Sequence, residues 1–359
     1  MIWTRLPASA RSPRPDLRRD WDRLNAARLD LPFLSADAVV AALDAFGNDG
    51  ACLFVCQAGE QAVAMFLLVP EGALRWRTFQ PSQLPLGAWV AARDAELPAL
   101  CRSLMRSRLR LCLALSVTQV DPLHTPQPAD APDTESAAYI DTAWIDIEGD
   151  FDTYWAARGK NLRQNLKKQR NRLATEGTAT ELRVWRQPQD MAPALTRYGA
   201  LESAGWKGRE GTAIHPDNAQ GRFYTRLFEE AARRGEALVF EYLLGERCAA
   251  IDLCLLRQGV LVMLKTAYDE AMPKTLSPAL LLHEAELQRM FADGEVRRVE
   301  FYGRVMDWHT RFTEHRRGLY HLTAYRWPAV KALALRRRAA AQARAPATAE
   351  PVASDAEGN

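Results

Sequence analysis

Residues 237–266 read ALVFEYLL-GER-CAAIDLCLL-RQG-VLVMLKT. The three apolar runs, at residues 237–244, 248–256 and 260–266, are strand-like in length and composition. The two connectors are polar, contain glycine and are short enough to be hairpin turns. This stretch therefore predicts an antiparallel meander of three strands, and the remaining elements are placed around it.

A helix and two strands are expected after the meander. Ser277 and Pro278 form a strong helix start, because Ser caps free N–H groups and Pro fits the first helical position. Leucines and Phe291 continue this helix, and Gly294 ends it. Strands are expected at residues 296–302 and 320–326.

Further elements are expected before the meander. In the second half of the chain we expect strands at residues 143–147 and 181–186 and helices at 150–159, 160–175, 193–204 and 219–233. In the first half we expect helices at residues 21–29, 36–46 and 97–108 and strands at 53–56, 63–68 and 110–117. The order of elements is similar in the two halves and more complete in the second.

This order predicts an α+β protein with two halves. The chain has 359 residues, of which 48% are hydrophobic, so it is long enough to form two domains. Residues 121–133 are rich in Pro, Asp, Thr and Ala and are typical of a linker. We expect an irregular tail over residues 1–20, one half over 21–135, another over 140–330, and a partly disordered tail over 331–359.

The bulk composition is that of a cytoplasmic globular protein. The net charge is +3, which excludes a polycation. No secretory signal is visible, and the longest dense apolar run, residues 62–69, is too short to span a bilayer. The six cysteines form no C-x-x-C pair, so we expect reduced, buried thiols and no metal site.

Three segments together resemble a known family. They are KNLRQNLKKQR at residues 160–170, LESAGWKGREGTA at 201–213, and LKTAYDE at 264–270 followed by SPALL at 277–281. This combination is similar to the BioF2-like acetyltransferase domain of the CelD/BcsL type, over roughly residues 145–305. The resemblance implies tandem GNAT-like (acyl-CoA N-acyltransferase) halves, each a mostly antiparallel mixed sheet flanked by helices, with the first half degenerate.

The resemblance also implies a function. We expect an acyltransferase that moves an acyl group from acyl-CoA, a co-substrate, to an amine, with no permanently bound cofactor. CelD-type proteins are associated with polysaccharide production, so the acceptor is expected to be an amino sugar or a sugar-linked amine. One alternative is an aminoacyl-tRNA-dependent transferase like the related Fem-type peptidoglycan ligases. Another is an inactive GNAT scaffold that binds a ligand or partner.

Donor binding is expected at the helix that starts at Ser277, because its free N–H groups and dipole attract phosphate. GNAT proteins use a Q/R-x-x-G-x-G/A loop there, whereas residues 274–279 lack those glycines, which keeps another donor open. The alternative is a simple cap of a core helix. The strand at residues 260–266 is expected to offer a backbone N–H to the thioester carbonyl. The residues proposed to bind the donor are Leu264, Lys265, Lys274, Ser277, Ala279 and Leu280.

Acyl transfer also needs a base and an acid. Asp252, Glu241 and Asp269 are candidate bases; Asp252 interrupts an apolar strand, so its carboxylate is either paired or functional. Tyr268 and Tyr302 are candidate acids, although a tyrosine at a strand end is often a packing residue. His215, His283 and His309 show no triad spacing and receive no catalytic role.

Substrate contacts are expected on the basic helix at residues 160–175 and in two loops. The helix carries many cations and forms either an electropositive rim or an ordinary solvated face. Trp206 and Lys207 lie in a glycine-flanked loop, where the aromatic ring is either part of a substrate lid or a core residue. The residues proposed for substrate contact are Lys160, Arg163, Trp206, Lys207, Asp269 and Arg304.

Overall fold

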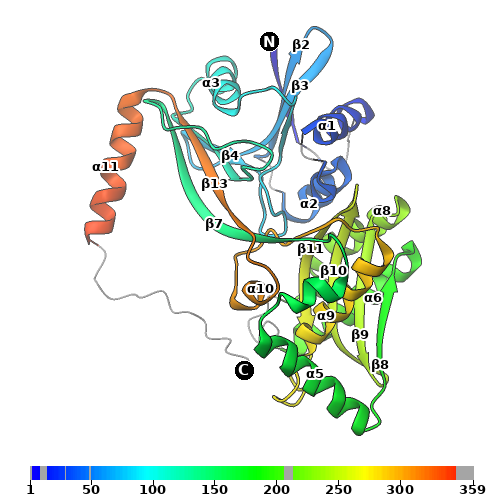
Figure 1. Ribbon diagram of the computed structural model, residues 1–359. Helices are drawn as coiled ribbons and strands as arrows, with labels where there is room; N and C mark the ends of the chain where they lie inside the picture. The colour runs from blue at the N-terminus through cyan, green and yellow to red at the C-terminus, as the bar shows by residue number, and fades with distance from the viewer. Residues whose placement is uncertain (1, 9–13, 29, 48–49, 206–212, 345–359) are drawn as a thin grey trace.

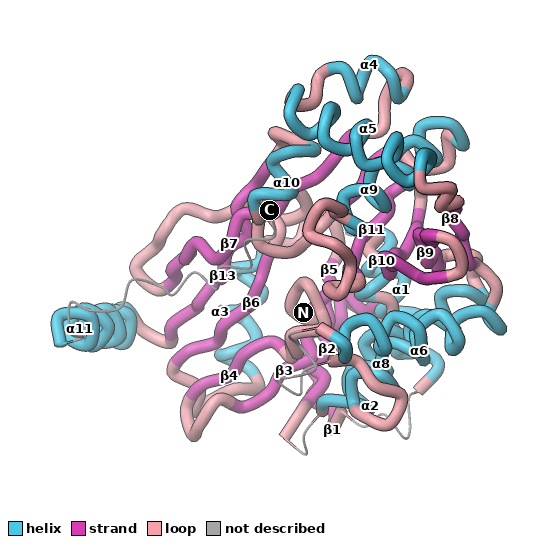
Figure 2. Tube along the Cα trace, turned by 90° about the horizontal axis from the view of Figure 1, so that it is seen from below, coloured by secondary structure: helices cyan, strands magenta, loops and turns pink. Residues whose placement is uncertain are grey.

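The computed structural model describes residues 2–8, 14–28, 30–47, 50–205 and 213–344 (Figure 1). Within these ranges no helix is both long enough and apolar enough to cross a bilayer. The strands form one large mixed sheet whose order is β1-β2-β3-β4-β6-β13-β7-β12-β11-β10-β9-β8, with β5 paired to β3. Helices cover the sheet on several sides (Figure 2).

The predicted meander forms the centre of the second half. Its strands are β9 (Ala237–Leu244), β10 (Arg247–Arg257) and β11 (Val260–Tyr268), flanked by β8 (Thr180–Trp185) and β12 (Arg298–Glu300). The antiparallel pairings of β9 with β10 and of β10 with β11 confirm the two predicted hairpins. The helices of this half are α4 (Phe151–Ala156), α5 (Lys160–Thr175), α6 (Pro188–Ala204), α8 (Ala219–Arg233), α9 (Pro278–Asp293) and α10 (Asp307–Phe312).

The first half follows the same order of elements. Its strands are β1 (Ile2–Pro7), β2 (Cys52–Ala58), β3 (Gln61–Pro70), β4 (Arg75–Thr78), β5 (Trp89–Ala91) and β6 (Ala114–Val120). Its helical segments are α1 (Pro15–Arg28), η1 (Pro32–Leu34), α2 (Ala36–Phe46) and α3 (Leu97–Ser107). In each half a three-strand meander leads to a short parallel pair, β4 with β6 and β11 with β12.

The expectation of an irregular tail over residues 1–20 is corrected by β1. This strand pairs antiparallel with β2 over its whole length, and α1 already starts at Pro15. The physical reason is burial: the Trp3 side chain is 1% exposed and its Nε1 donates to Ser103 Oγ at 3.0 Å. At the other end, α11 (Pro328–Arg344) is a helix where the sequence predicted a partly disordered tail, and residues 345–359 lie outside the described ranges.

Two long strands connect the sheets of the two halves. Strand β7 (Thr134–Asp146) has 13 residues, and its last three pair with β12 of the second half. Strand β13 (Arg316–Tyr325) pairs with β7 and also with β6 of the first half. The boundary expected between residues 135 and 140 therefore falls inside β7, and β13, expected in the second half, completes the sheet of the first.

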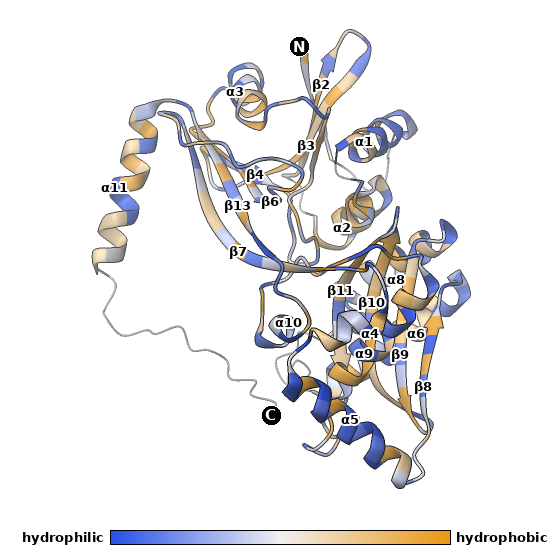
Figure 3. Cartoon of the chain, in the orientation of Figure 1, coloured by the Kyte–Doolittle hydropathy of each residue, from blue (hydrophilic) through white to orange (hydrophobic). Residues whose placement is uncertain are grey.

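The halves also share a hydrophobic core. One cluster of buried residues combines α1, η1 and α2 of the first half with α6 and α8 of the second; at its centre the Phe33 ring meets the Tyr302 ring edge to face, with centroids 5.2 Å apart. The outer faces of the sheet have separate cores, under α5 and α9 in one half and under α3 in the other. Figure 3 shows the apolar strands inside and the hydrophilic outer side of α5.

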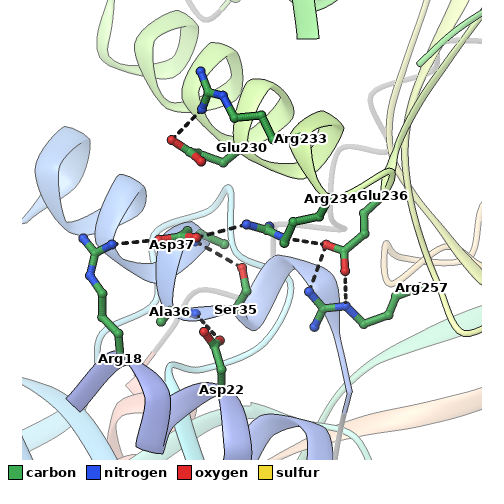
Figure 4. Close-up of polar contacts among 11 residues, drawn as sticks. Arg18, Asp22, Ser35, Ala36, Asp37, Glu230, Arg233, Arg234, Glu236 and Arg257 are labelled. Carbon is green, nitrogen blue, oxygen red and sulfur yellow. Dashed lines mark hydrogen bonds and ion pairs between the residues drawn. The ribbon is translucent and has the colours of Figure 1, made fainter. Parts of the chain in front are cut away.

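A network of ion pairs lies at the edge of this shared core (Figure 4). Asp37 of α2 accepts from Arg18 of α1 at 2.8 Å and from Arg234, which follows α8, at 3.0 Å. Arg234 also binds Glu236, and Arg257 of β10 donates to Glu236 at 2.7 Å. The network links both halves at the edge of their common core.

Candidate functional site

Strands β11 and β12 separate next to the start of α9. Their parallel pairing covers three residue pairs, from Val260–Arg298 to Val262–Glu300. Beyond these pairs β11 continues to Tyr268 along β10, whereas the chain after Glu300 follows β7. A parallel pair that opens in this way leaves backbone N–H and C=O groups of both strands without ladder partners. An extended ligand can therefore enter between them.

A β-bulge lies on β11 at this opening. Leu253 of β10 is opposite Lys265, and Cys254 is opposite Met263, so Leu264 is the extra residue. The extra residue of a bulge is left out of the regular ladder. Its backbone N–H is thus a candidate donor to a developing oxyanion, which is the role predicted for Leu264 and Lys265.

The N-terminus of α9 is partly occupied by a side chain from α5. Gln169 Oε1 accepts from the Ser277 backbone N–H at 2.8 Å. Pro278 has no N–H, and within the described ranges the backbone N–H groups of Ala279 and Leu280 have no hydrogen-bond partner. Both residues are half-buried, so two N–H groups at a positive helix end stay open to an anion.

Helix α5 brings cations to this end of α9. Besides the Gln169 contact, Arg172 Nη1 donates to Thr275 Oγ1 at 2.6 Å, in the loop before α9. Lys160, Lys167 and Lys168 are exposed, and within the described ranges none of them forms an ion pair. Arg163 is half-buried and donates to the Arg158 carbonyl. Unpaired surface lysines beside a helix N-terminus attract phosphate groups.

Glu300 lies at the end of β12, where the two strands part. Its carboxyl group is 2% exposed, and burial raises the pKa of Glu300 to about 7 although Arg317 acts against this shift. Arg317 Nη1 donates to Glu300 Oε1 at 3.2 Å, and its other N–H groups form a bidentate pair with Asp121. A carboxyl group that titrates near neutral pH is suited to accept a proton from an amine.

Tyr302 belongs to the same polar group. Its side chain is buried between Phe33 and the Arg317 guanidinium, which lies 5.4 Å from the ring centroid. Burial raises the pKa of the Tyr302 hydroxyl well above its usual value. The backbone at Tyr302 has φ of 52°, a left-handed conformation that is strained for a residue with a large side chain. Strain of this kind concentrates at functional sites.

The other predicted acid and bases lie in different surroundings. Tyr268 ends β11 with its side chain 41% exposed, and partial burial raises its pKa. Asp269 is paired with Arg247. Burial would raise the pKa of Glu241, but hydrogen bonds from Arg197 and Trp185 hold it below the usual value. Asp252 is fully buried beside His283.

The Lys265 side chain points toward α6 and away from α9, the helix expected to bind the donor. Its Nζ lies 3.1 Å from Glu202 Oε1, and Tyr198 donates to the same carboxylate oxygen at 3.2 Å. Lys274 and Arg304 are exposed. Trp206 and Lys207 lie outside the described residues. The predicted site residues therefore do not form one cluster: the donor residues gather at α9, and the polar groups lie on the face that carries α6.

Sequence reasoning missed Gln169, Glu202, Glu300 and Arg317. Glu300 interrupts the apolar run around Val299 and Phe301, so the argument applied to Asp252 could have found it. Gln169 gives no local signal, because an isolated glutamine on a basic helix is an ordinary surface residue. Its role depends on a contact across 108 residues of sequence.

Two cavities lie elsewhere. One of about 330 Å³ is lined by residues of α6 and α8, Arg222 and Glu229 among them, and by Ile214 and Pro216. The other, about 240 Å³, lies at the C-terminal end of α9 beside β8 and β9. Neither contains a residue of β11 or of the start of α9, where the features that suit a donor are free backbone groups and charge.

In the first half the equivalent opening is closed by the chain itself. The Gly87 N–H donates to the Thr118 carbonyl of β6 at 3.1 Å, and a Cβ at Gly87 would lie 2.5 Å from that oxygen. Asp94 and Glu96 precede α3, where their charges repel an anion from the helix N-terminus. The closed opening and the acidic residues before α3 both make donor binding in the first half unfavourable, which is consistent with a working site in the second half alone.

Comparisons with known proteins agree with this architecture. Residues 160–310 match the family model described as an acetyltransferase (GNAT) domain. No curated protein sequence matches the chain. The C-terminal domain (DUF2156) of a protein described as a lysylphosphatidylglycerol synthetase from Agrobacterium fabrum is similar in structure, with 13% identity, a TM-score of 0.55, and coverage of 89% of this chain and 96% of that one.

Two further solved structures extend over nearly the whole chain. FemX has 9% identity and a TM-score of 0.55 and covers 92% of this chain and 99% of its own. L-PGS from Bacillus licheniformis has 15% identity and a TM-score of 0.50, with 86% and 97% coverage. At these identities the similarity concerns the fold alone. The predicted α+β fold of tandem GNAT-like halves is confirmed.

Proposed function

We propose that this protein transfers an acyl group from acyl-CoA to an amine. One observation carries the proposal: β11 and β12 part beside the start of α9, where two backbone N–H groups have no partner within the described ranges. The opening suits the extended arm of the donor, and the helix end suits its phosphates. The cations of α5 reinforce the attraction.

The chemistry follows from the groups around the opening. Glu300, directly or through a water molecule, takes a proton from the acceptor ammonium. The neutral amine nitrogen attacks the thioester carbonyl carbon, and the N–H at the Leu264 bulge stabilises the oxyanion. The C–N bond forms as the C–S bond breaks, the nitrogen gives up its second proton, and the thiolate leaves with the electron pair and takes up a proton. Tyr268 is the candidate acid, because its side chain ends β11 and is partly exposed.

We further propose that the protein belongs to the BioF2-like, CelD/BcsL-type group and works in the cytoplasm on an amino sugar or a sugar-linked amine of the cell envelope. The support is the combination of segments at residues 160–170, 201–213 and 264–281. Substrate contacts are assigned to Lys160, Arg163 and Arg304.

A second candidate is transfer of an aminoacyl group from charged tRNA. It is favoured by the exposed lysines of α5 and by the tandem fold shared with FemX over nearly the whole chain. Calorimetry with acetyl-CoA, longer acyl-CoAs and charged tRNA separates the two candidates. Steeply salt-dependent tRNA binding without CoA binding would select the second. No donor binding at all would select the scaffold alternative.

The donor site is tested by Ala279→Glu. A carboxylate at the first turn of α9 occupies the anion site and repels phosphate, so we expect donor affinity to fall at least about tenfold. Ala292→Glu is the matched control, because it places the same charge on an exposed position of the same helix about 20 Å away along its axis. Equal donor affinity of Ala279→Glu, Ala292→Glu and wild type would eliminate the site.

A further inference from the structure

A buried cluster of one imidazole and two carboxylates lies between β10 and α9. Asp252 points from β10, and His283 and Glu286 lie one turn apart on α9; their side chains are at most 4% exposed. His283 Nδ1 is 3.1 Å from Asp252 Oδ2 and 3.0 Å from Glu286 Oε1. One nitrogen or oxygen atom from each residue lies within 4.8 Å of the other two. The cluster takes no part in the proposed acyl transfer.

When both carboxyl groups are ionised, the cluster has too few hydrogen-bond donors for its acceptors. His283 Nδ1 carries at most one proton, which can be donated well to one of the two carboxylates. Within the described ranges, both oxygens of Asp252 and Glu286 Oε2 receive no hydrogen bond of good geometry, although His283 Nδ1 lies 3.1 Å from Asp252 Oδ2. An unsatisfied buried carboxylate is costly, and such groups usually indicate an unseen water molecule or ion.

The spacing of the three groups matches a metal coordination sphere. Nitrogen and oxygen ligands lie about 2.0–2.2 Å from zinc. Two ligands at this distance are about 3.0 Å apart at a right angle and about 3.4 Å apart at the tetrahedral angle. The two distances from Nδ1, 3.0 and 3.1 Å, fall at the lower end of this range. Only a small adjustment of the side chains is therefore needed for these three groups to surround an ion.

The surroundings fix the imidazole in the required orientation. The His283 ring stacks on Trp308 at a centroid distance of 4.7 Å and an interplanar angle of 18°. Its edge meets the Phe312 ring at 5.7 Å and 87°. The two aromatic rings hold the imidazole plane, and in this orientation Nδ1 lies next to both carboxylates. Buried, apolar walls strengthen the attraction of two carboxylates for a cation.

We propose that Asp252, His283 and Glu286 bind a divalent transition-metal cation, with zinc as the probe. One imidazole nitrogen with carboxylate oxygens suits zinc, manganese or iron, whereas magnesium and calcium prefer oxygen alone. The bound ion neutralises both carboxylates and ties α9 to β10. No sequence pattern indicated this site, because the expectation of no metal site rested on cysteine spacing and the three ligands come from two separate elements.

The experiment measures metal content and thermal stability of the full chain. Protein produced with zinc in the medium is analysed by mass spectrometry for bound metal, and its Tm is followed after EDTA treatment and after zinc is returned. We expect stoichiometric zinc, a lower Tm after EDTA, and recovery with zinc, since a ligand that binds only the folded state raises its stability. Cobalt substitution adds a visible absorption spectrum that reports nitrogen and oxygen ligation.

Variants distinguish this site from adventitious binding. Asp252→Asn and Glu286→Gln keep the side-chain shapes but remove carboxylate ligands, so we expect zinc to be lost and the Tm to become insensitive to EDTA. Glu284→Gln is the matched control, since Glu284 is buried on the same helix but pairs with Arg170 of α5. This control is expected to keep stoichiometric zinc.

Several outcomes would overturn the proposal. If the wild-type protein takes up no zinc, manganese or cobalt and its Tm does not change with any of these metals, Asp252, His283 and Glu286 only share protons. Zinc retained by Asp252→Asn and Glu286→Gln would place the ion elsewhere. If these variants fail to fold, the wild-type metal content and the cobalt spectrum still decide. Donor binding is measured separately, so failure of the metal site leaves the acyltransferase proposal untouched.

Discussion

At the scale of single residues, Glu300 is the side chain on which the proposed chemistry depends most. It is buried at the point where β12 leaves β11, and it has Arg317 as a cationic partner. Burial destabilises the carboxylate and Arg317 stabilises it, and the balance raises the pKa of Glu300 to about 7. The group is therefore poised between its two protonation states near neutral pH.

Replacing Glu300 by Gln tests this role. If Glu300 is the base, its deprotonated form is active, so the wild-type rate should rise with pH through about 7. Glu300→Gln should lower kcat by roughly 10²–10⁴-fold and abolish that dependence. Glu295→Gln, at an exposed glutamate paired with Arg186, is the control and should keep the wild-type profile. An unchanged profile in Glu300→Gln would remove Glu300 from the mechanism.

The same carboxyl group links stability to pH. The pKa of Glu300 rises from an ordinary 4.5 to about 7 in the folded protein, so between these values the folded state binds more protons than the unfolded state. The free energy of unfolding should therefore fall as pH rises through this window. Urea unfolding at a series of pH values should show this slope in wild type and a weaker slope in Glu300→Gln.

At the scale of elements, α5 and α9 form the donor side of the site. Gln169 and Arg172 fasten α5 to the residues before α9, so the exposed lysines of α5 are held beside a positive helix end. The arrangement favours the electropositive-rim interpretation of the basic helix.

Charge reversal on α5 measures its contribution. Lys167→Glu combined with Lys168→Glu should weaken binding of acyl-CoA, and more strongly that of charged tRNA, because both donors carry phosphate. For tRNA the slope of log affinity against log salt should become shallower by roughly 0.7–0.9 for each phosphate that the variant no longer neutralises. Arg336→Glu with Arg337→Glu on exposed α11 is the control. Equal effects of the two double variants would reduce α5 to a solvated surface.

At the scale of the whole molecule, the halves are joined by strand exchange and by a shared core. Each half offers one face to the common core, and β7 and β13 connect their sheets. Aromatic packing at the interface is fully buried, whereas the ion pairs at its edge are partly exposed. These two kinds of contact should differ strongly in their contribution to stability.

The contrast is tested with Phe33→Ala and Asp37→Asn. Phe33 is fully buried against Tyr302, so its removal should lower the free energy of unfolding by about 3–5 kcal/mol. The Asp37 side chain is 33% exposed, and removal of its pairs with Arg18 and Arg234 should cost less than about 1 kcal/mol. Urea unfolding of both variants gives the comparison. A larger destabilisation by Asp37→Asn would mean that charge holds the halves together.

Separation of the halves provides a further test. A fragment of residues 140–330 matches the predicted second half, but it lacks β6, the first part of β7 and all apolar partners from α1 and α2. We expect this fragment to show no cooperative unfolding transition, while the full chain shows one. A fragment that stays in solution and unfolds cooperatively would support the predicted domain division at residues 135–140.

The local structure of this protein could be predicted from its sequence alone. The meander, its two hairpins and the start of α9 follow from apolar periodicity, turn residues and a proline in the first helical turn, which act over a few neighbouring residues. The capping hydrogen bond predicted for the Ser277 side chain is not formed. The polar residue in an apolar strand marked Asp252 as unusual for the same reason. The resemblance carried by three short segments added the fold family.

Which distant residues meet could be learned only from the folded chain. Gln169 reaches Ser277 across 108 residues, and Arg317 reaches Asp121 across 196. Asp252 meets two side chains of α9 only because that helix packs on β10, and β7 and β13 exchange between sheets through pairings that no local pattern encodes. Such contacts are selected by packing and by the need to pair buried polar groups, and these are properties of the molecule as a whole.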